Sequence, residues 1–172
     1  FSIFKSRSIW LVTNLFATIV AASVVGEFQD ITAQLSILAV LMPIVASMGG
    51  TTGQQTLAVV VRSLATKELN SRNALRMIGK EFMVGLCNGL LFAVMIGIAV
   101  RIWFPGQEMI SYIIALAMLC NLTVASLAGI LIPLTINRLK IDPAIASGVF
   151  LIACTDSGGY FIFLGLAKLL LF

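Results

Sequence analysis

Asp156 is the residue of this sequence whose chemistry is hardest to explain by packing alone. It is the only charged residue in the run 143–167, where the other side chains are apolar or small and polar. A carboxylate at the centre of a membrane span costs about 2.5–3.5 kcal/mol on insertion scales, so it rarely faces lipid and commonly marks an ion or proton path. At helical spacing, Gly148 lies two turns before Asp156 and Gly159 one turn after it, which leaves room for water. The pattern therefore predicts ion or proton conduction.

A single carboxylate with access to water suits a hard cation. Mg²⁺ keeps several of its waters and is commonly held by one or two carboxylates. Two copies of the chain across a two-fold axis would supply two carboxylates, and cyclic dimers are the commonest assembly. We therefore expect a cation pathway at a homodimer interface, with Na⁺, Ca²⁺, Mn²⁺ and H⁺ still open. The alternative for Asp156 is a buried hydrogen bond to Asn88, Asn121 or a hydroxyl group.

A second polar stretch occupies residues 42–56, where three glycines within five positions precede two glutamines. Lipid offers no hydrogen-bond partner to hydroxyl and amide groups, so these side chains must face other helices or water. Small residues also allow helix backbones to approach closely. Two interpretations stay open, a tight helix contact and a pore wall lined by backbone oxygens and amides. The residues concerned are Gly49, Gly50, Thr51, Gly53, Gln54 and Gln55.

The composition indicates an integral membrane protein. Of the 172 residues, 60% are hydrophobic and 10% charged, whereas soluble domains carry about 25% charged residues. The net charge of +4 does not by itself predict nucleic-acid binding. No nucleotide-binding GxxxxGK[ST] stretch, nucleophile–base pair or metal cluster occurs, so we do not expect an enzyme. The three cysteines fall in apolar stretches, which predicts buried small residues rather than ligands.

The uncharged runs predict an all-α membrane protein with five transmembrane helices per chain. About 20 apolar residues cross the hydrocarbon core, and two of the runs are long enough to tilt or to include interfacial ends. The positive-inside rule places the N-terminus in the cytoplasm and the C-terminus outside the plasma (inner) membrane, because nine of eleven cations then lie inside. The runs are 8–26, 31–61, 82–100, 109–137 and 143–167, the last broken by Asp156.

The connections between these spans carry the remaining charges. Residues 62–80 are expected to form a cytoplasmic loop, with room for a short amphipathic helix. The outer connections are short and contain Glu27, Asp30 and Glu108. These acids either concentrate cations at an outer mouth or are ordinary solvated charges.

Three segments of the sequence resemble the membrane domain of the MgtE family of magnesium channels. The first is PIVASMGG from Pro43, with Gly53, Gln55 and Arg62 following. The second combines residues 132–133 with IDPA at 141–144 and ASG at 146–148. The third is the Thr-Asp pair ending at Asp156, with FIFLGLA at 161–167. The resemblance covers essentially the whole chain, residues 1–172.

The resemblance implies a homodimer with one pore on the two-fold axis, walled by the second and fifth membrane helices. It implies that Asp156 recognises hydrated Mg²⁺, the transported ion, which passes down its electrochemical gradient. Backbone carbonyls near this aspartate would help to hold the waters of the ion, and Ile152 and Ala153 are the candidates by helical spacing. The rivals are a cation-coupled secondary transporter for Mg²⁺ or another divalent cation, and a non-conducting scaffold in the lipid membrane.

The sequence departs from the family pattern at several positions. Thr51 and Gln54 stand where the family usually carries Asn, which affects the prediction of ion preference or gating at the second helix. Ser157 and Gly158 replace larger residues, which predicts a wider or wetter pore. The family's cytoplasmic N-terminal domain and paired CBS domains, which regulate the pore, are absent from this chain. Either they were cut away or the protein never had them, and conduction without them would lack cytoplasmic feedback.

Overall fold

The computed structural model describes residues 2–69 and 73–171 of the chain. Within these residues there are six helices and no strand. Five of the helices are long and apolar enough to cross a membrane, which confirms the all-α class and the five predicted spans. The elements are α1 (Ser2–Gly26), α2 (Gln29–Gln34), α3 (Ser36–Ala65), α4 (Ala74–Trp103), α5 (Glu108–Arg138) and α6 (Pro143–Leu171).

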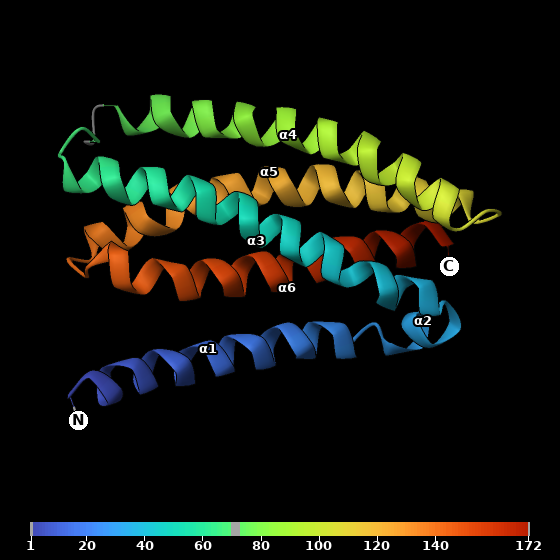
Figure 1. Ribbon diagram of the computed structural model, residues 1–172, viewed down its shortest axis with the longest axis horizontal. Helices are drawn as coiled ribbons and strands as arrows, with labels where there is room; N and C mark the ends of the chain where they lie inside the picture. Colours follow the sequence, from blue (N-terminus) through green and yellow to red (C-terminus); the bar gives the residue numbers. More distant parts are fainter. Residues whose placement is uncertain (1, 70–72, 172) are drawn as a thin grey trace.

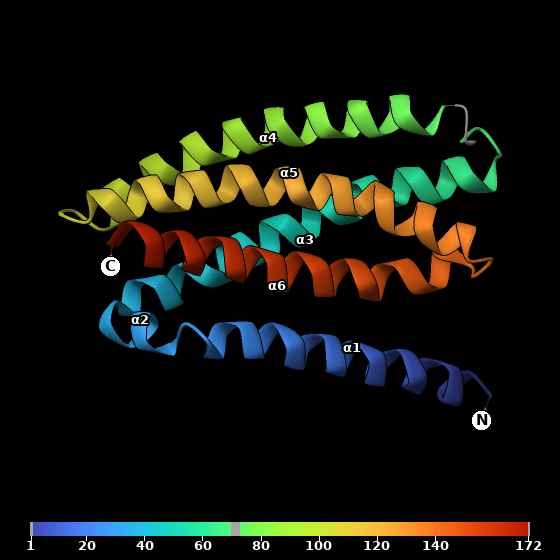
Figure 2. The ribbon, with the colours of Figure 1, turned by 180° about the vertical axis from the view of Figure 1, so that it is seen from behind.

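The five long helices run alternately up and down the molecule (Figure 1). The N-terminus and the α3–α4 and α5–α6 connections lie at one end, and the C-terminus and the short α2 lie at the other (Figures 1 and 2). α5 is the central helix, because it packs against α3, α4 and α6 and has 61% of its apolar window buried. α1 packs on α6 and has only 6% of its window buried. The outer faces of α1 and α4 are thus left for lipid or another chain.

The long apolar run 31–61 is divided into two helices. Leu35 leaves the helical region at φ −126° and ψ 82°, and it separates α2 from α3. Its backbone N–H still donates to the Ile31 carbonyl at 2.9 Å. The run 31–61 is thus longer than one crossing because it contains the short helix α2 as well as most of the membrane helix α3. This agrees with the expectation that the run includes an interfacial end.

The predicted loop 62–80 is largely helical. α3 continues through Arg62 to Ala65, and α4 begins at Ala74. Residues 70–72 lie outside the described residues, and no separate amphipathic helix forms in the described remainder of this segment. Charge is thus carried on the extended ends of two membrane helices, where it can reach water.

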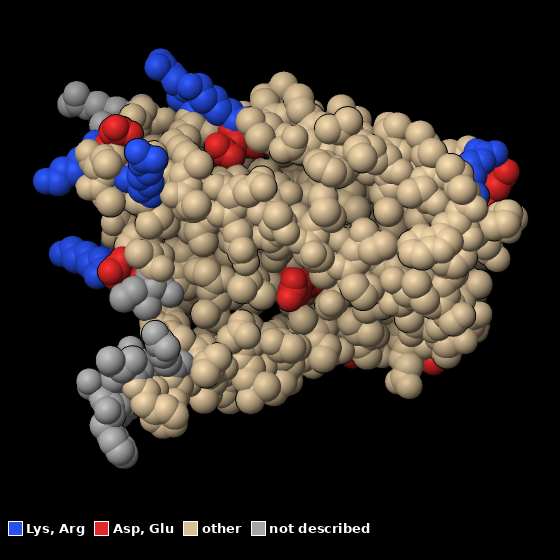
Figure 3. Space-filling view, in the orientation of Figure 1, with Lys and Arg blue, Asp and Glu red and all other residues tan. Residues whose placement is uncertain are grey.

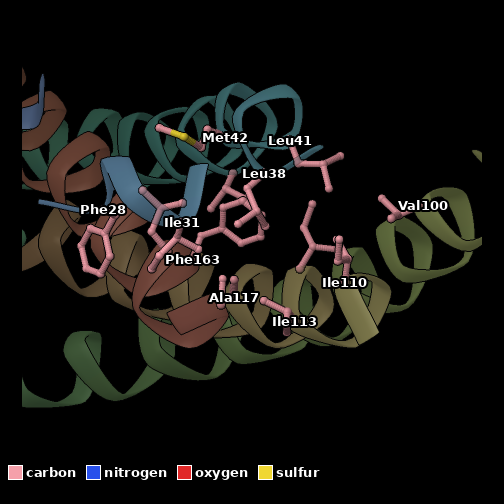
Figure 4. Close-up of a cluster of buried hydrophobic side chains, with 14 residues drawn as sticks. Phe28, Ile31, Leu38, Leu41, Met42, Val100, Ile110, Ile113, Ala117 and Phe163 are labelled. Atoms are coloured by element: carbon pink, nitrogen blue, oxygen red, sulfur yellow. The ribbon is translucent and has the colours of Figure 1, made fainter. Parts of the chain in front are cut away.

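A hydrophobic cluster joins α2 to the ends of α3, α5 and α6 (Figure 4). Phe28 and Ile31 enter it from the α2 segment, and Phe163 from α6 is fully buried within it. This packing positions α3 against α6 before the two helices reach their polar middle sections. The side chains labelled in Figure 4 are Phe28, Ile31, Leu38, Leu41, Met42, Val100, Ile110, Ile113, Ala117 and Phe163.

Charged groups gather toward the two ends of the molecule, and one acidic group stands alone amid uncharged residues (Figure 3). Across the α4–α5 connection, Arg101 donates to Glu108 at 2.8 Å. Both side chains are more than half exposed, and such exposed pairs stabilise a fold by only about 0.2–1 kcal/mol. Glu108 is therefore an ordinary paired surface charge in the protomer.

The prediction that the cysteines are buried is wrong for two of the three. Cys87 and Cys154 are exposed on the protomer and Cys120 is half-buried. In a membrane protein an apolar residue is stable on the outer face of a helix as well as in the core, so apolar surroundings in the sequence do not specify burial.

Candidate functional site

The glycine-rich stretch of α3 lies where this helix crosses α5 and α6. A Cβ atom added to Gly53 would come within 2.9 Å of the Leu151 side chain and 3.3 Å of the Ala125 carbonyl. A Cβ at Gly50 would be 3.8 Å from the Thr155 hydroxyl, which is an ordinary contact. Glycine at these positions therefore lets the backbone of α3 approach α5 and α6 closely.

Asn121 of α5 is held between Gly49 and Gly159, two further glycines of the predicted site. Its side-chain amide donates a 2.7 Å hydrogen bond to the Val45 carbonyl of α3. A Cβ added to Gly49 would collide with the Asn121 side chain, and one added to Gly159 would come within 3.2 Å of it. Asn121 is 1% exposed, so this is a buried polar contact that ties three helices together. In the sequence Asn121 is only an alternative partner for Asp156, whereas in the structure its amide bonds across to α3.

Asp156 lies on α6, directly after the residue that faces Gly50. It is partly exposed in the protomer. Among the described residues its carboxylate has no hydrogen bond: the Asn121 amide donates to the Val45 carbonyl, and Asn88 lies on α4, which packs on α5. The alternative of a buried hydrogen bond for Asp156 is therefore not found in this part of the chain.

The hydroxyl of Thr155 fixes the backbone just before Asp156. It is buried and donates to the carbonyls of Leu151 at 3.0 Å and Ile152 at 3.2 Å. Ile152 and Ala153, the two predicted carbonyl ligands, lie on the same helix one turn before Asp156 and are half-buried. The three residues are thus neighbours along one strip of α6.

The predicted pore-lining residues fall into three groups in the protomer. Gly49, Gly53 and Gly159 are buried between helices, while Gly50 and Gly148 are partly exposed. Thr51 and Gln54 are exposed on one face of α3 near its middle, where Thr51 donates to the Ser47 carbonyl at 2.8 Å. Gln55 is also exposed, one helical turn after Thr51, and it lines a groove toward α4.

Two hydroxyl groups of α6 have no partner within the described residues. Ser147 is fully buried, and the Oγ atoms of both Ser147 and Ser157 are shielded without a hydrogen bond. Buried polar groups in folded proteins nearly always have a partner, and water or a second chain can supply one. In a single protomer these two hydroxyl groups therefore lack a partner, one close to Asp156 and one nine residues before it, on the opposite side of α6.

Sequence reasoning missed Glu81 of α4. Its Oε2 atom accepts a 2.8 Å hydrogen bond from the hydroxyl of Thr56, which is a buried residue of α3. The available signal was its position directly before the uncharged run 82–100, where an acid stands among the cations of a helix end. Its direction toward α3 depends on the packing of α4.

No dedicated metal cluster occurs in the described part of the chain, since no group of three or more His, Cys, Asp or Glu side chains comes together. A cation at Asp156 would therefore have to keep most of its waters, as Mg²⁺ commonly does.

The comparisons with known proteins agree with these features. The family model described as MgtE, divalent cation transporter, matches residues 42–166, which include the glycine stretch, Asn121 and Asp156. Magnesium transporter MgtE of Bacillus subtilis is 35% identical over 158 residues, which are 92% of this chain and 35% of the relative. Magnesium transporter MgtE of Enterococcus faecalis is 36% identical over 165 residues, 96% of this chain and 36% of the relative.

A third relative, magnesium transporter MgtE of Thermus thermophilus, is 29% identical over 171 residues, 99% of this chain and 37% of its own length. The chain thus spans about a third of the length of these curated relatives. Because the family model matches most of the chain, including both polar segments of α3 and α6, the protein belongs to the MgtE family of divalent cation transporters.

Proposed function

We propose that this chain forms a magnesium-permeable channel, in which hydrated Mg²⁺ passes down its electrochemical gradient. The observation that carries the proposal is the Asp156 carboxylate, which lies within a membrane span, is partly exposed and has no hydrogen bond among the described residues. A charge in that position is stable only beside water, an ion or another polar group. The relatives named as magnesium transporters support Mg²⁺ as the ion.

The pathway requires a second copy of the chain in this proposal. Thr51 and Gln54 are exposed at the middle of α3, at a depth where lipid offers them no hydrogen bond. A homodimer that joins the exposed faces of α3 and α6 would enclose these groups around water and would bring two Asp156 carboxylates to one axis.

Within this pore, Asp156 would attract the ion and would contact its retained waters. The Ile152 and Ala153 carbonyls would accept hydrogen bonds from the same waters, since they precede Asp156 by one helical turn. The buried glycines would keep α3 close enough to α6 for both helices to share the wall. The proposed wall exposes Gly50, Thr51, Gln54 and Gly148, with Gln55 at its edge toward α4 and Gly49, Gly53 and Gly159 buried behind it.

The orientation in a plasma membrane follows from the distribution of cations. Cations gather on the ends of α3, α4 and α5, which carry Arg62, Arg76, Lys80 and Arg138, and in the α5–α6 connection with Lys140. These ends lie together at one end of the molecule (Figure 1). We propose that this end faces the cytoplasm, because cytoplasmic connections carry an excess of Lys and Arg. The N-terminus would then be cytoplasmic and the C-terminus external.

The test is Mg²⁺ uptake into proteoliposomes that contain a magnesium-sensitive dye, with wild type beside Asp156→Asn. We expect the substitution to reduce uptake at least about tenfold, because it removes the only charge inside the span. Asp142→Asn is the matched control. Asp142 lies at a helix end and accepts a 2.9 Å hydrogen bond from the Ala144 N–H, which Asn can also accept. Equal uptake by wild type and Asp156→Asn would overturn the proposal.

The same vesicles distinguish a channel from a cation-coupled transporter. A channel is driven by the magnesium gradient and the membrane potential, so collapsing a proton or sodium gradient should not change its flux. Uptake that stops when one of those gradients is removed would replace the channel by a coupled transporter. Competition by Ca²⁺ and Mn²⁺ in the same assay ranks the selectivity.

A further inference from the structure

An apolar groove lies between α5 and α6 at the basic end of the molecule, which is the end that carries the cations of α3, α4 and α5. The two helices pack side by side in Figure 2, and the groove between them has a volume of about 370 Å³. Apart from Thr135, whose hydroxyl donates to the Leu131 carbonyl at 2.8 Å, its lining is apolar. The lining residues are Leu131, Ile132, Thr135, Ile136, Leu139, Ile141, Ala146 and Phe150.

The groove is open and runs along a membrane span. Leu131 is 45% exposed and Phe150 is 53% exposed, so its interior can be reached from the surface of the protomer. From Leu131 to Leu139 the groove follows α5 for about 12 Å, at 1.5 Å per residue. One leaflet of a bilayer has a hydrocarbon layer of about 15 Å, half of the whole core. The groove therefore has the length and the apolar lining that suit part of one acyl chain.

Two cations stand at the end of the groove. Arg138 and Lys140 alternate with Leu139 and Ile141, the lining residues of the α5–α6 connection, and both cations are exposed. Neither forms an ion pair with Asp142 or with any other acid among the described residues. The apolar groove thus ends at positive charge that the protomer does not neutralise.

Lys140 occupies a backbone position that favours glycine. Its φ is 59°, in the left-handed region, where a Cβ atom strains the backbone. Its N–H donates to the Asn137 carbonyl at 3.1 Å, and the N–H of Ile141 donates to the Ile136 carbonyl at 3.2 Å. This is the Schellman pattern of a helix end, in which glycine is the usual residue at the position of Lys140. A cationic side chain is therefore present where the turn alone would be more stable with none.

We propose that this groove binds an anionic phospholipid, with an acyl chain along α5 and the phosphate between Arg138 and Lys140. An apolar groove that ends at two unpaired cations is complementary to a molecule with an apolar tail and a negative head. Each Lys or Arg close to an anionic lipid surface strengthens the attraction about fivefold. A zwitterionic lipid fits the same groove, but the cations do not favour it.

The site is independent of the proposed pore. Phe150 precedes Asp156 by six residues, which places it about 120° around α6 and away from the face that would meet a second copy. Lipid binding therefore requires only that the chain be embedded in a bilayer, and its measurement is separate from Mg²⁺ uptake.

The test places a fluorescent reporter in the groove of the full chain reconstituted in vesicles. Phe150→Trp is made in a background in which Trp10 and Trp103 are replaced by Phe. Phospholipids with brominated acyl chains quench a neighbouring tryptophan, so quenching in lipid mixtures measures which lipid occupies the groove. We expect brominated phosphatidylglycerol to bind there about tenfold or more tightly than brominated phosphatidylcholine. Phe16→Trp, at a 65% exposed position of α1, is the reporter control and should show no preference.

Charge variants then identify the cations responsible. Arg138→Gln with Lys140→Gln should bring the preference close to one. Arg62→Gln with Lys67→Gln is the matched control, because it removes the same charge at the same end of the molecule from residues that do not line the groove. This pair should keep the preference.

Lys140→Gly separates the turn from the side chain. Glycine relieves the left-handed backbone, so the variant should unfold at a higher temperature in neutral detergent. It should nevertheless lower the preference for phosphatidylglycerol about fivefold, since one of the two cations is gone. A Lys140→Gly protein with the full preference would contradict the role of this side chain.

Three results overturn the proposal. The first is equal binding of the two lipids at position 150. The second is an equal loss of preference in the Arg62 and Lys67 control pair, which would indicate a general effect of surface charge. The third is a reporter that neither lipid quenches, which would mean that protein covers the groove. Asp156→Asn should leave the lipid preference unchanged, so failure of the channel proposal and failure of this one are distinguishable.

Discussion

The side chain of Asn121 donates a 2.7 Å hydrogen bond to the backbone carbonyl of Val45, and both residues are buried. Val45 lies one helical turn before Gly49, and Gly49 in turn packs against the same Asn121 side chain. A polar contact of this kind specifies the register of α3 against α5 more sharply than apolar packing does, because the acceptor is one particular atom. It also reaches α6 through Gly159, so the position of the Asp156 helix depends on it.

Replacement of Asn121 by Ala should lower the free energy of unfolding by about 1–2 kcal/mol. The substitution removes an interhelical hydrogen bond and leaves a void among three helices. Thermal unfolding in detergent measures the effect. Thr123→Val is the matched control, since the Thr123 hydroxyl donates to the Leu119 carbonyl within its own helix, at 2.8 Å. Equal destabilisation by the two variants would show that Asn121 does not join the helices.

Gly129→Ala should disrupt the contact between α3 and α5. A Cβ atom at this position would come within 2.6 Å of the Gly53 carbonyl and 2.8 Å of the Thr56 side chain, and a backbone carbonyl cannot move aside cheaply. We expect a loss of stability of about 1–3 kcal/mol or more, measured by thermal unfolding.

Gly79→Ala is the control for helix propensity at a glycine of the same fold. Nothing lies within 4 Å of a Cβ at Gly79, and Ala is a better helix former than Gly by about 0.8–1 kcal/mol. This variant should be neutral or stabilised. If Gly129→Ala were as stable as Gly79→Ala, the close approach of α3 to α5 would be contradicted.

The proposed dimer predicts a cross-link between two copies of α3. Thr51 is exposed at the middle of this helix, and a residue close to a two-fold axis meets its own copy. In a background in which Cys87, Cys120 and Cys154 are replaced by Ser, mild oxidation of Thr51→Cys should yield a covalent dimer on a non-reducing gel.

Leu91→Cys in the same background is the control for random collision. Leu91 is 56% exposed on α4 and lies outside the proposed interface. Cross-linking of Leu91→Cys with an efficiency equal to that of Thr51→Cys, or no cross-linking of Thr51→Cys, would count against a dimer that joins the α3 faces.

The proposed orientation predicts which connections a membrane-impermeant maleimide reaches in intact cells. Gln107→Cys lies in the α4–α5 connection and should react from outside, in the same cysteine-free background. Leu139→Cys, which follows α5 at the basic end and is 65% exposed, should react only after the cells are permeabilised. The reverse pattern would invert the topology and would place the cations outside.

Much of the architecture could be predicted from local properties of the sequence. The lengths of the uncharged runs specify five spans, because crossing the hydrocarbon core requires about 20 apolar residues whatever the neighbouring helices are. A lone carboxylate in such a run is conspicuous for the same reason, so the sequence by itself singles out Asp156 as a candidate. The break at Leu35 was not located, because the run remains apolar on both sides of it and no proline or glycine marks the turn.

The side on which each polar residue lies was decided only by tertiary packing. Gln54 and Gln55 are adjacent in the chain and both are exposed, yet a helix separates adjacent residues by about 100°, and Gln55 borders the groove toward α4. The helical period in the sequence gives the angles between residues around one helix, but not the direction in which any of them points in the folded protein. Which face meets protein, lipid or water depends on where the neighbouring helices pack, and the same packing brings Thr56 and Glu81 together across 25 positions of sequence.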